Sequence, residues 1–414
     1  MQEAWIIDAC RTPRGIGKKG KGALADQHPQ HLGATVLRAI AERNQLETAD
    51  VDDVIFGTSS QRGQQGGDLA RMAALEAGYD VRSSGMTLDR FCGSGITSVN
   101  LAAMSIMSGT EDLVIGGGAE MMSTYGDDAS SRSPFIDSDN LVLREMHPQP
   151  HQGVCADAIA TIEKIDRSSV DTLALESQQK AANAIKNGYF DKSLIPVHGW
   201  DGSLVLDAEE FPRPQTTLQG LGELKPSFEP LADYPLDEKG TTFRSLVLKK
   251  YPELKISHIH HAGNSSGVVD GAAAVLLASP DYARAHGMQP RAKIRAMCNM
   301  GDCPTLMLNA PVPSAKKALQ KAGLSLKDID LFEINEAFAT QVLGCLKLLE
   351  VDFNDSRVNP NGGAIAVGHP LGASGARIAL TATRQLERSG GRYAAISLCI
   401  GIGQGLAAIL ERID

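Results

Sequence analysis

Strands and helices are expected to alternate along the first third of the chain. Short apolar stretches at 4–9, 54–56 and 113–115 have the length of buried strands. Helices are expected between them, at about 31–44 and at 68–78, and after Cys92 the apolar residues Ile96, Val99, Ala103 and Ile106 recur at the three- and four-residue steps of a helix. This alternation predicts a mostly parallel sheet that helices cover on both faces. It constrains the fold strongly because it recurs later in the chain.

The last third of the chain repeats the pattern of the first. Residues 292–297 are predicted to form a strand and residues 312–323 a helix. The stretch around Asp330 then matches the stretch around Asp53, which lies 277 positions earlier. The repeat predicts two similar α/β halves related by a pseudo-two-fold axis.

The same offset pairs a cysteine with a histidine. Adding the same 277 positions to Cys92 gives His369. Both residues lie in Gly-rich turns between a predicted strand and a helix. Pseudo-symmetric halves can place two such turns opposite each other. At the start of a helix, free N–H groups and the helix dipole favour the thiolate of Cys92, which is the nucleophilic form. A buried structural cysteine at a turn is the alternative interpretation.

The region between the halves has a different character. Residues 122–255 mix loops, Pro-rich links and helices, of which the clearest is expected at about 169–186. We predict a first α/β half at 1–121, completed by about 256–285, and a second half at 286–414. The middle region would be an inserted, mostly helical cap or loop domain over the site. At 414 residues the chain is also too long for one ordinary core.

Composition argues against several classes of function. The chain has 43% hydrophobic and 21% charged residues, as soluble globular proteins do. A net charge of −9 without a dense basic run argues against a nucleic-acid partner. Seven irregularly spaced cysteines predict a reducing compartment rather than a disulfide framework. We find no secretory leader, membrane-length apolar run or peroxisomal ending, and therefore expect a cytoplasmic protein without a membrane partner.

Six short motifs occur together in a fixed order. They are Arg90-Phe91-Cys92-Gly93-Ser94-Gly95, Gly117-Gly118-Ala119-Glu120-Met121-Met122-Ser123, Gly263-Asn264-Ser265-Ser266-Gly267, Asn335-Glu336-Ala337-Phe338, Gly362-Gly363-Ala364-Ile365-Ala366-Val367-Gly368-His369-Pro370 and Cys399-Ile400-Gly401. Each motif alone is weak, but their joint order is very specific. On these motifs the chain resembles the thiolases, which are acyl-CoA C-acyltransferases, from end to end. The resemblance implies a duplicated α-β-α-β-α layered fold with an inserted cap domain.

The resemblance also implies a catalytic set. Cys92 would be the nucleophile that carries the acyl group, and His369 would be the base that takes its proton. Cys399 would move the proton at the α-carbon of acetyl-CoA. One oxyanion hole would use the backbone N–H groups of Cys92 and Gly401. The other would use His369 with a water held by Asn335.

Three further residues are candidate contacts to coenzyme A (CoA) or its thioester. Ser266 resembles the family's pantetheine contact, and His151 resembles a histidine that some members place beside the thioester. Lys225 is a third candidate for CoA binding. The resemblance implies no cofactor beyond CoA as co-substrate, and acyl-CoA and CoA as the small-molecule partners. It also implies a homodimer or homotetramer.

Structural interpretations of these residues remain open. Taken alone, Cys399 could be core packing in an apolar strand, His369 part of a turn, and Asn335 a helix N-cap. The cluster of His258, His260 and His261 suggests a metal site. Alternation along a strand would put His258 and His260 on one face, but we find no suitably spaced carboxylate or cysteine and predict no metal.

The predicted function is cleavage of a 3-oxoacyl-CoA with CoA to acetyl-CoA and a shortened acyl-CoA, or the reverse Claisen condensation. Both directions would proceed through an acyl-cysteine at Cys92. An acetoacetyl-CoA-forming biosynthetic thiolase is the first alternative. A related condensing enzyme would usually pair its cysteine with two histidines, and Cys399 argues against it. A non-catalytic acyl-lipid-binding relative should lack a reactive group, and none is missing.

Departures from the family pattern concern the acyl specificity. Gln152 and Ala158 stand where the family has Met and Asn, and Val269 replaces the Asn before Asp-Gly-Ala. The link at 230–255 is also longer than many members carry. We therefore predict activity on 3-oxoacyl-CoAs that are longer or more functionalised than acetoacetyl-CoA.

Overall fold

A large sheet forms the framework of the computed structural model, which describes residues 2–126 and 133–413. The first half of the chain and the segment after the insert contribute β1 (Trp5–Arg11), β2 (Gly15–Ile16), β3 (Asp53–Gly57), β4 (Ser84–Leu88), β5 (Leu113–Met121) and β8 (Val269–Ala278). The last third contributes β9 (Ala292–Gly301), β10 (Leu331–Ile334), β11 (Tyr393–Ile400) and β12 (Gln404–Arg412). The strand order is β10-β11-β12-β9-β1-β8-β5-β3-β4, with β2 paired to β8.

The two halves of the sheet have the same strand arrangement. In the first half β3 pairs in parallel with β5, which pairs antiparallel with β8. In the second half β10 pairs in parallel with β11, which pairs antiparallel with β12. The halves join where Trp5 and Ile6 of β1 lie opposite Lys293 and Ala292 of β9. The predicted duplication of the fold is confirmed.

The prediction of a mostly parallel sheet is wrong. Parallel pairing is confined to β3 with its neighbours β4 and β5 and to β10 with β11 among the named strands of the described residues. Parallel neighbours need a long crossover, whereas β11 and β12 are joined by the tight turn at residues 401–403. Strand β8 enters from the insert and runs opposite to both β1 and β5. The sheet is therefore mixed.

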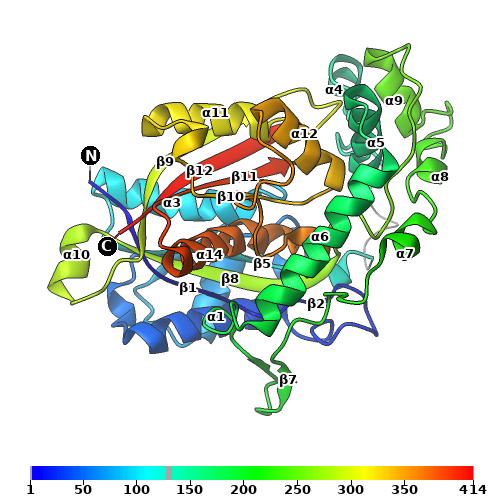
Figure 1. Cartoon of the computed structure of the whole chain (residues 1–414). Helices are drawn as coiled ribbons and strands as arrows, with labels where there is room; N and C mark the ends of the chain where they lie inside the picture. Colours follow the sequence, from blue (N-terminus) through cyan, green and yellow to red (C-terminus); the bar gives the residue numbers. More distant parts are fainter. Residues whose placement is uncertain (1, 127–132, 414) are drawn as a thin grey trace.

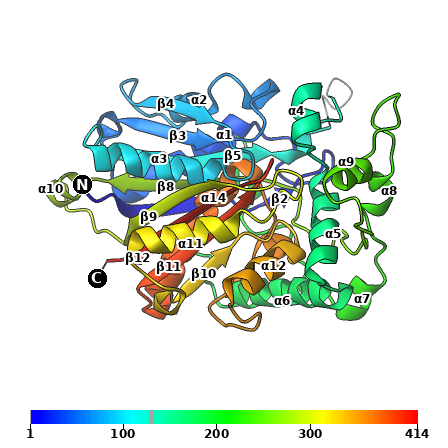
Figure 2. The same ribbon diagram turned by 90° about the horizontal axis from the view of Figure 1, so that it is seen from above.

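Helices form three layers around the two half-sheets (Figures 1 and 2). The central layer holds α3 (Ser94–Ser108) and α14 (Leu371–Ser389), whose apolar faces pack together with the inner faces of both half-sheets. They approach closely at Gly375, where an added Cβ would lie 2.1 Å from the backbone nitrogen of Ile96. The outer layers are α1 (Pro29–Asn44) with α2 (Leu69–Glu76), and α11 (Pro311–Ala322) with α12 (Ala339–Leu349). The α-β-α-β-α order predicted from sequence is confirmed.

Most helices of the segment between the halves lie on the side of the molecule away from the two ends of the chain, while β7 projects at the bottom of the view (Figure 1). Its elements are α4 (Leu141–Met146), α5 (Gln152–Glu163), α6 (Arg167–Lys186), β6 (Val197–His198), β7 (Leu204–Leu206), α7 (Leu218–Gly222), α8 (Glu229–Ala232) and α9 (Phe243–Lys250). The helix expected at 169–186 is α6, which begins two residues earlier because the Asp166 side chain caps it by accepting from the Ser169 N–H. Residues 127–132 of the predicted insert lie outside the described residues, and the domain boundaries stay a prediction.

Two short helices complete the fold. Helix α10 (Pro280–Ala285) follows β8, and α13 (Ala364–Val367) lies directly before the His369 turn. Within the described residues, no helix combines the length and apolar character needed to span a membrane.

Candidate active site

Cys92 lies in a tight turn between β4 and α3. Phe91 has a positive φ of 47°, a left-handed backbone conformation that is uncommon outside glycine. The Asp89 carboxylate accepts from the Phe91 N–H at 2.7 Å, and the Ser94 hydroxyl donates to the Phe91 carbonyl at 2.6 Å. Gly93 allows the turn to pack closely against Ile400, because an added Cβ at this position would lie only 2.3 Å from the end of the Ile400 side chain. The sequence folds here into a turn that holds Cys92 against residues 399–401.

The environment of Cys92 favours the thiol over the thiolate. Burial raises the pKa of Cys92 to about 12, and the negative charges of Glu120 and Asp89 act in the same direction. The backbone N–H groups of Cys92 and Gly401 face the sulfur and oppose this rise. The sequence-based prediction that the turn favours the thiolate is therefore wrong for the resting site, because burial outweighs the N–H groups.

The pH dependence of alkylation reports this protonation state. With a thiol pKa of about 12, the rate of Cys92 alkylation by iodoacetamide should rise about tenfold per pH unit from about pH 7 to about pH 10. Mass spectrometry of the Cys92 peptide measures the rate. Half-buried Cys303 is an internal reference, because the Leu306 N–H, Tyr251 and Lys250 lower its pKa despite its burial. A plateau for Cys92 near neutral pH would contradict the assignment.

His369 lies between α13 and the start of α14 and is buried. Its Nδ1 lies 2.5 Å from the Ser374 hydroxyl. Because that hydroxyl donates its own proton to the Pro370 carbonyl, it accepts a hydrogen bond from His369, and Nδ1 therefore carries a proton. Its Nε2 lies 3.2 Å from Asn335 Nδ2, which can only donate. Burial, reinforced by the charge of Arg377, lowers the pKa of His369 to about 3. The ring is thus neutral and presents Nε2 as its acceptor.

Asn335 follows the end of β10. Its backbone N–H donates to the Ser397 carbonyl of β11 at 2.9 Å, and its side-chain oxygen is buried without a partner among the described residues. Neighbouring Glu336 accepts from Ser177, Asn359 and the Ile365 N–H, which ties this turn to α13. Helix α12 begins later, with Phe338 at its N-cap. The alternative that Asn335 caps a helix is therefore wrong.

Cys399 lies near the end of β11 and is almost fully buried. Burial raises its pKa well above the usual range, and the charge of Cys92 adds to that rise. Gly401, two residues on, is packed against Phe91, whose ring would lie 3.1 Å from an added Cβ. The two cysteine-bearing turns thus meet at one place, where the sulfur of Cys92 faces the Gly401 N–H.

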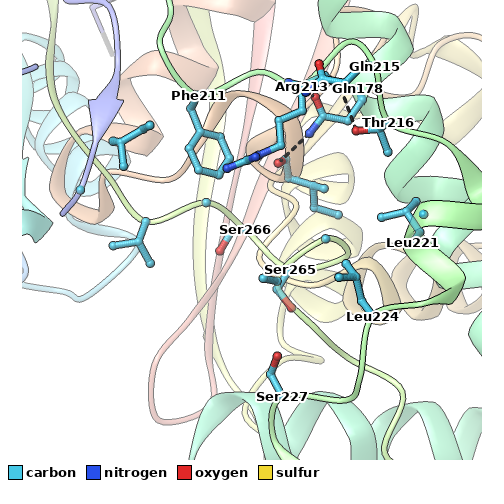
Figure 3. Close-up of a pocket in the computed structure, with 18 of the residues that line it drawn as sticks. Gln178, Phe211, Arg213, Gln215, Thr216, Leu221, Leu224, Ser227, Ser265 and Ser266 are labelled. Carbon is cyan, nitrogen blue, oxygen red and sulfur yellow. Dashed lines mark hydrogen bonds between the residues drawn. The ribbon is translucent and has the colours of Figure 1, made fainter. Parts of the chain in front are cut away.

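A cavity of about 850 Å³ opens beside this site (Figure 3). Ser266 lines it, and the Phe211 ring packs against the neighbouring Gly267, where an added Cβ would lie 2.3 Å from that ring. The neighbouring Gly267 carbonyl accepts from the His369 N–H at 2.8 Å, which links the cavity wall directly to the histidine turn. Lys18, Phe211 and Arg213 also line the cavity, and the sequence analysis had assigned them no role. They carry no motif: Phe211 and Arg213 come from the insert, and Lys18 comes from the segment directly after β2.

The other two candidate CoA contacts have different surroundings. His151 caps α5 by accepting from the Gly153 N–H at 3.1 Å, and its ring lies 5.6 Å from those of Phe228 and Phe243. Burial lowers the pKa of His151 to about 4, and Phe228 is part of the cavity wall. Lys225 is exposed and does not belong to that wall.

The histidine cluster is part of a buried hydrogen-bond network. His258 and His260 do not lie in a strand, contrary to the prediction, and both contact Asp157 through Nδ1, at 2.6 and 2.7 Å. His261 contacts Asp171 at 2.9 Å. Asp157 could not be recognised as a partner from sequence, because it comes from α5, about a hundred residues earlier. No group of three or more potential metal ligands is found among the described residues.

The fold and the comparisons that follow define a class of protein: an enzyme that transfers acyl groups and is built from two α/β halves. Residues 4–231 match the model of the thiolase N-terminal domain, and residues 288–412 match that of the thiolase C-terminal domain. The chain belongs to the thiolase family, so the predicted family and enzyme class, acyltransferase, are confirmed. Thiolases cleave 3-oxoacyl-CoA with CoA or run the reverse condensation.

Similar proteins span the whole chain. It is 40% identical to a beta-ketoadipyl-CoA thiolase of Pseudomonas knackmussii, with all of both chains covered. It is 41% identical to the 3-oxoadipyl-CoA/3-oxo-5,6-dehydrosuberyl-CoA thiolase of Escherichia coli, again with full coverage of both. A 3-ketoacyl-CoA thiolase of Aliivibrio fischeri is 38% identical over both full lengths.

Proposed function

We propose that this thiolase acts through an acyl group carried on Cys92, with His369 as the base. The observation that carries this proposal is the neutral His369 ring, whose Nε2 is the acceptor while Ser374 holds Nδ1. As the thiol attacks the 3-keto carbon, its proton moves to His369 Nε2 and a sulfur–carbon bond forms. A base is needed because a thiol pKa of about 12 keeps Cys92 protonated at rest, whereas the thiolate is the form that attacks.

Carbon–carbon cleavage then releases acetyl-CoA. The bond between C2 and C3 breaks, and its electron pair stays on C2 as the enolate of acetyl-CoA. Cys399 gives its proton to C2, which its raised pKa supports because the thiol form holds that proton at rest. The proton held on His369 then returns to the Cys399 thiolate. A CoA thiol next gives its proton to His369 as its sulfur attacks the acyl-Cys92 carbonyl, and Cys92 leaves as a thiolate that recovers this proton from His369. Backbone N–H groups of Cys92 and Gly401 are the donors for the oxyanion at this thioester.

The cavity beside Ser266 is the proposed CoA site. CoA is anionic, and Lys18 and Arg213 supply positive charge at a cavity of a protein whose net charge is −9. Phe211 offers a flat apolar surface in the same wall. Ser266 is the proposed pantetheine contact, and His151 is proposed to lie beside the thioester. Lys225, which is exposed, has the weakest structural support of the predicted contacts.

We propose a 3-oxoacyl-CoA with a carboxylated acyl chain as the substrate. The names of the relatives, beta-ketoadipyl-CoA and 3-oxoadipyl-CoA thiolase, support this choice. Of the three departures from the family pattern, Ala158 and Val269 are buried, and Val269 packs against Gly368 next to the catalytic histidine. Gln152 is exposed at the start of α5. The acyl preference therefore rests on the relatives and on these buried positions.

A thiolysis assay with a substrate panel tests the acyl preference. We expect kcat/KM for 3-oxoadipyl-CoA to exceed that for acetoacetyl-CoA by about tenfold or more, the scale of one well-paired polar group. Straight-chain 3-oxoacyl-CoAs of matched length are the control for chain length alone. The highest kcat/KM for acetoacetyl-CoA would instead favour the biosynthetic alternative.

We further propose a homo-oligomer in a reducing compartment, the cytoplasm. Strand β4 is the last strand of the sheet, and apolar side chains near it are exposed, including Met72, Leu75, Val81 and Met86. All seven cysteines lie within the described residues and are free, which supports the compartment. Light scattering on the purified protein measures the oligomeric state, and a monomer would contradict the proposal.

A further inference from the structure

Glu120 is a fully buried carboxylate that the reaction outlined above does not use. It lies at the end of β5 and has no exposed surface. Its Oε1 accepts from the Thr58 hydroxyl at 3.1 Å and from Gln65 Nε2 at 2.9 Å. Its Oε2 accepts from the Ser59 N–H at 2.8 Å and from the Gly372 N–H at 2.7 Å. Three chain segments thus converge on one side chain.

The bond to Gly372 reaches across to the other half of the molecule. Gly372 is the second residue of α14, three positions after His369, and the N-cap Pro370 makes no side-chain hydrogen bond. Glu120 therefore supplies a cap that α14 lacks in its own sequence. The contact is close, because an added Cβ at Gly372 would lie 2.5 Å from the Gly57 carbonyl oxygen. The turn that carries His369 is fixed to the strand ends of the first half.

The same strand ends support the Cys92 turn. An added Cβ at Gly57 would lie 2.5 Å from the Ser94 carbonyl carbon, two residues after Cys92. Thr58 and Ser59, which follow Gly57 directly, are the residues that bind Glu120. Glu120 is thus connected to both catalytic turns through short, packed contacts.

Hydrogen-bond geometry favours the anionic form of Glu120. Both oxygens face N–H donors, and Gln65 cannot turn its amide around because its own oxygen accepts from the Met121 N–H. A proton on Oε2 would meet the Ser59 and Gly372 N–H groups, and a proton on Oε1 would have only the Thr58 hydroxyl as an acceptor. Burial raises the pKa of Glu120, while the Ser59 N–H and Gln65 amide hold it down.

We propose that Glu120 is a positioning residue of this thiolase, which ties the His369 turn to the strand ends beneath Cys92 and sets a fixed negative charge near the resting thiol. It acts through those two residues and touches no substrate. The other ionisable groups around Cys92 are Asp89 in its own turn, Cys399 on β11 and Tyr125, whose pKa also responds to Glu120 and Cys92. The inference rests on the roles proposed for Cys92 and His369, which acyl labelling of the wild-type protein tests separately.

Two substitutions separate the effect of the Glu120 charge from the effect of its side-chain length. Glu120→Gln keeps the size and removes the charge, so Cys92 alkylation at about pH 8 should become about three- to tenfold faster. Glu120→Asp keeps the charge but is one methylene too short to hold Gly372, so alkylation should follow the wild-type pH profile. In both variants kcat for thiolysis should fall by about tenfold or more, while KM for CoA changes by less than about threefold.

Controls and a milder variant keep the test decisive. Glu111→Gln, beyond the other end of β5, should leave both alkylation and kcat within about twofold of wild type. Should Glu120→Gln not fold, Thr58→Val removes one donor and leaves the carboxylate less neutralised, so Cys92 alkylation should become slower and kcat should fall by about threefold. Unchanged alkylation in Glu120→Gln, unchanged kcat in both Glu120 variants, or a Thr58→Val protein identical to wild type would overturn the proposal.

Discussion

Replacing Cys92 by alanine is expected to abolish thiolysis, condensation and acyl exchange together. Each of these reactions passes through the Cys92 sulfur, which the N–H groups of Cys92 and Gly401 face. Removal of a covalent nucleophile should reduce kcat by about 10⁴-fold or more. Initial rates of all three reactions, with thermal unfolding as a check on folding, measure the effect.

Labelling and a second cysteine variant make this result specific. After incubation with acetyl-CoA, peptide mapping of the wild-type protein should find the acetyl group on Cys92. Cys298→Ala is the matched control, because Cys298 is a buried cysteine of β9 that packs in the outer layer near α11. It should retain its activity within about twofold. Label on Cys155 or Cys399 would show that the nucleophile is assigned wrongly.

The Cys399→Ala variant should divide the reaction into its two parts. Carbon–carbon cleavage needs the Cys399 proton and should fall by about 10²–10⁴-fold, the usual scale of general acid–base catalysis. Exchange of the acyl group between Cys92 and CoA needs no proton at the α-carbon and should continue. Cleavage of 3-oxoacyl-CoA and exchange of labelled CoA into acetyl-CoA measure the two parts.

Cys345→Ala is the control for this variant. Cys345 is another buried cysteine whose charge contributes to the raised pKa of Cys399. Its sulfur accepts a hydrogen bond from the Gln341 side chain within α12. Both reactions should proceed normally in that protein. If Cys399→Ala lost exchange as completely as cleavage, Cys399 would be needed to keep the Cys92 site intact, and the proposed division would fail.

Much of this architecture could be predicted because it depends on local patterns. The repeat placed Cys92 and His369 at equivalent turns, and both do precede a central helix, α3 and α14. The directions of β8 and β12 were missed, since periodicity indicates that a strand exists but does not indicate how it pairs. Only the folded chain gives the direction in which a strand enters the sheet.

Electrostatics of the site could not be predicted from motifs. A turn at a helix start lowers the pKa of a cysteine, but burial of Cys92 raises it by more. The depth of burial depends on every layer of the fold and is not visible in a motif. Ser374 holds His369 from one turn into α14, at a spacing that matches no motif used above. The partnership of Asp157 with His258 joins α5 to a segment that is remote in sequence.

The position of β8 has a consequence for how the molecule is made. This strand lies between β1 and β5 in the sheet, yet the whole insert is translated before it. While the ribosome is still adding the insert, β1 and β5 each have an unpaired edge, and their apolar residues lack a covering neighbour. Such long-range pairing is slow and leaves the nascent chain prone to aggregation. Synthesis must pass Ala278 before the first half of the sheet can close, and until then the edges of β1 and β5 that face β8 stay open to other chains.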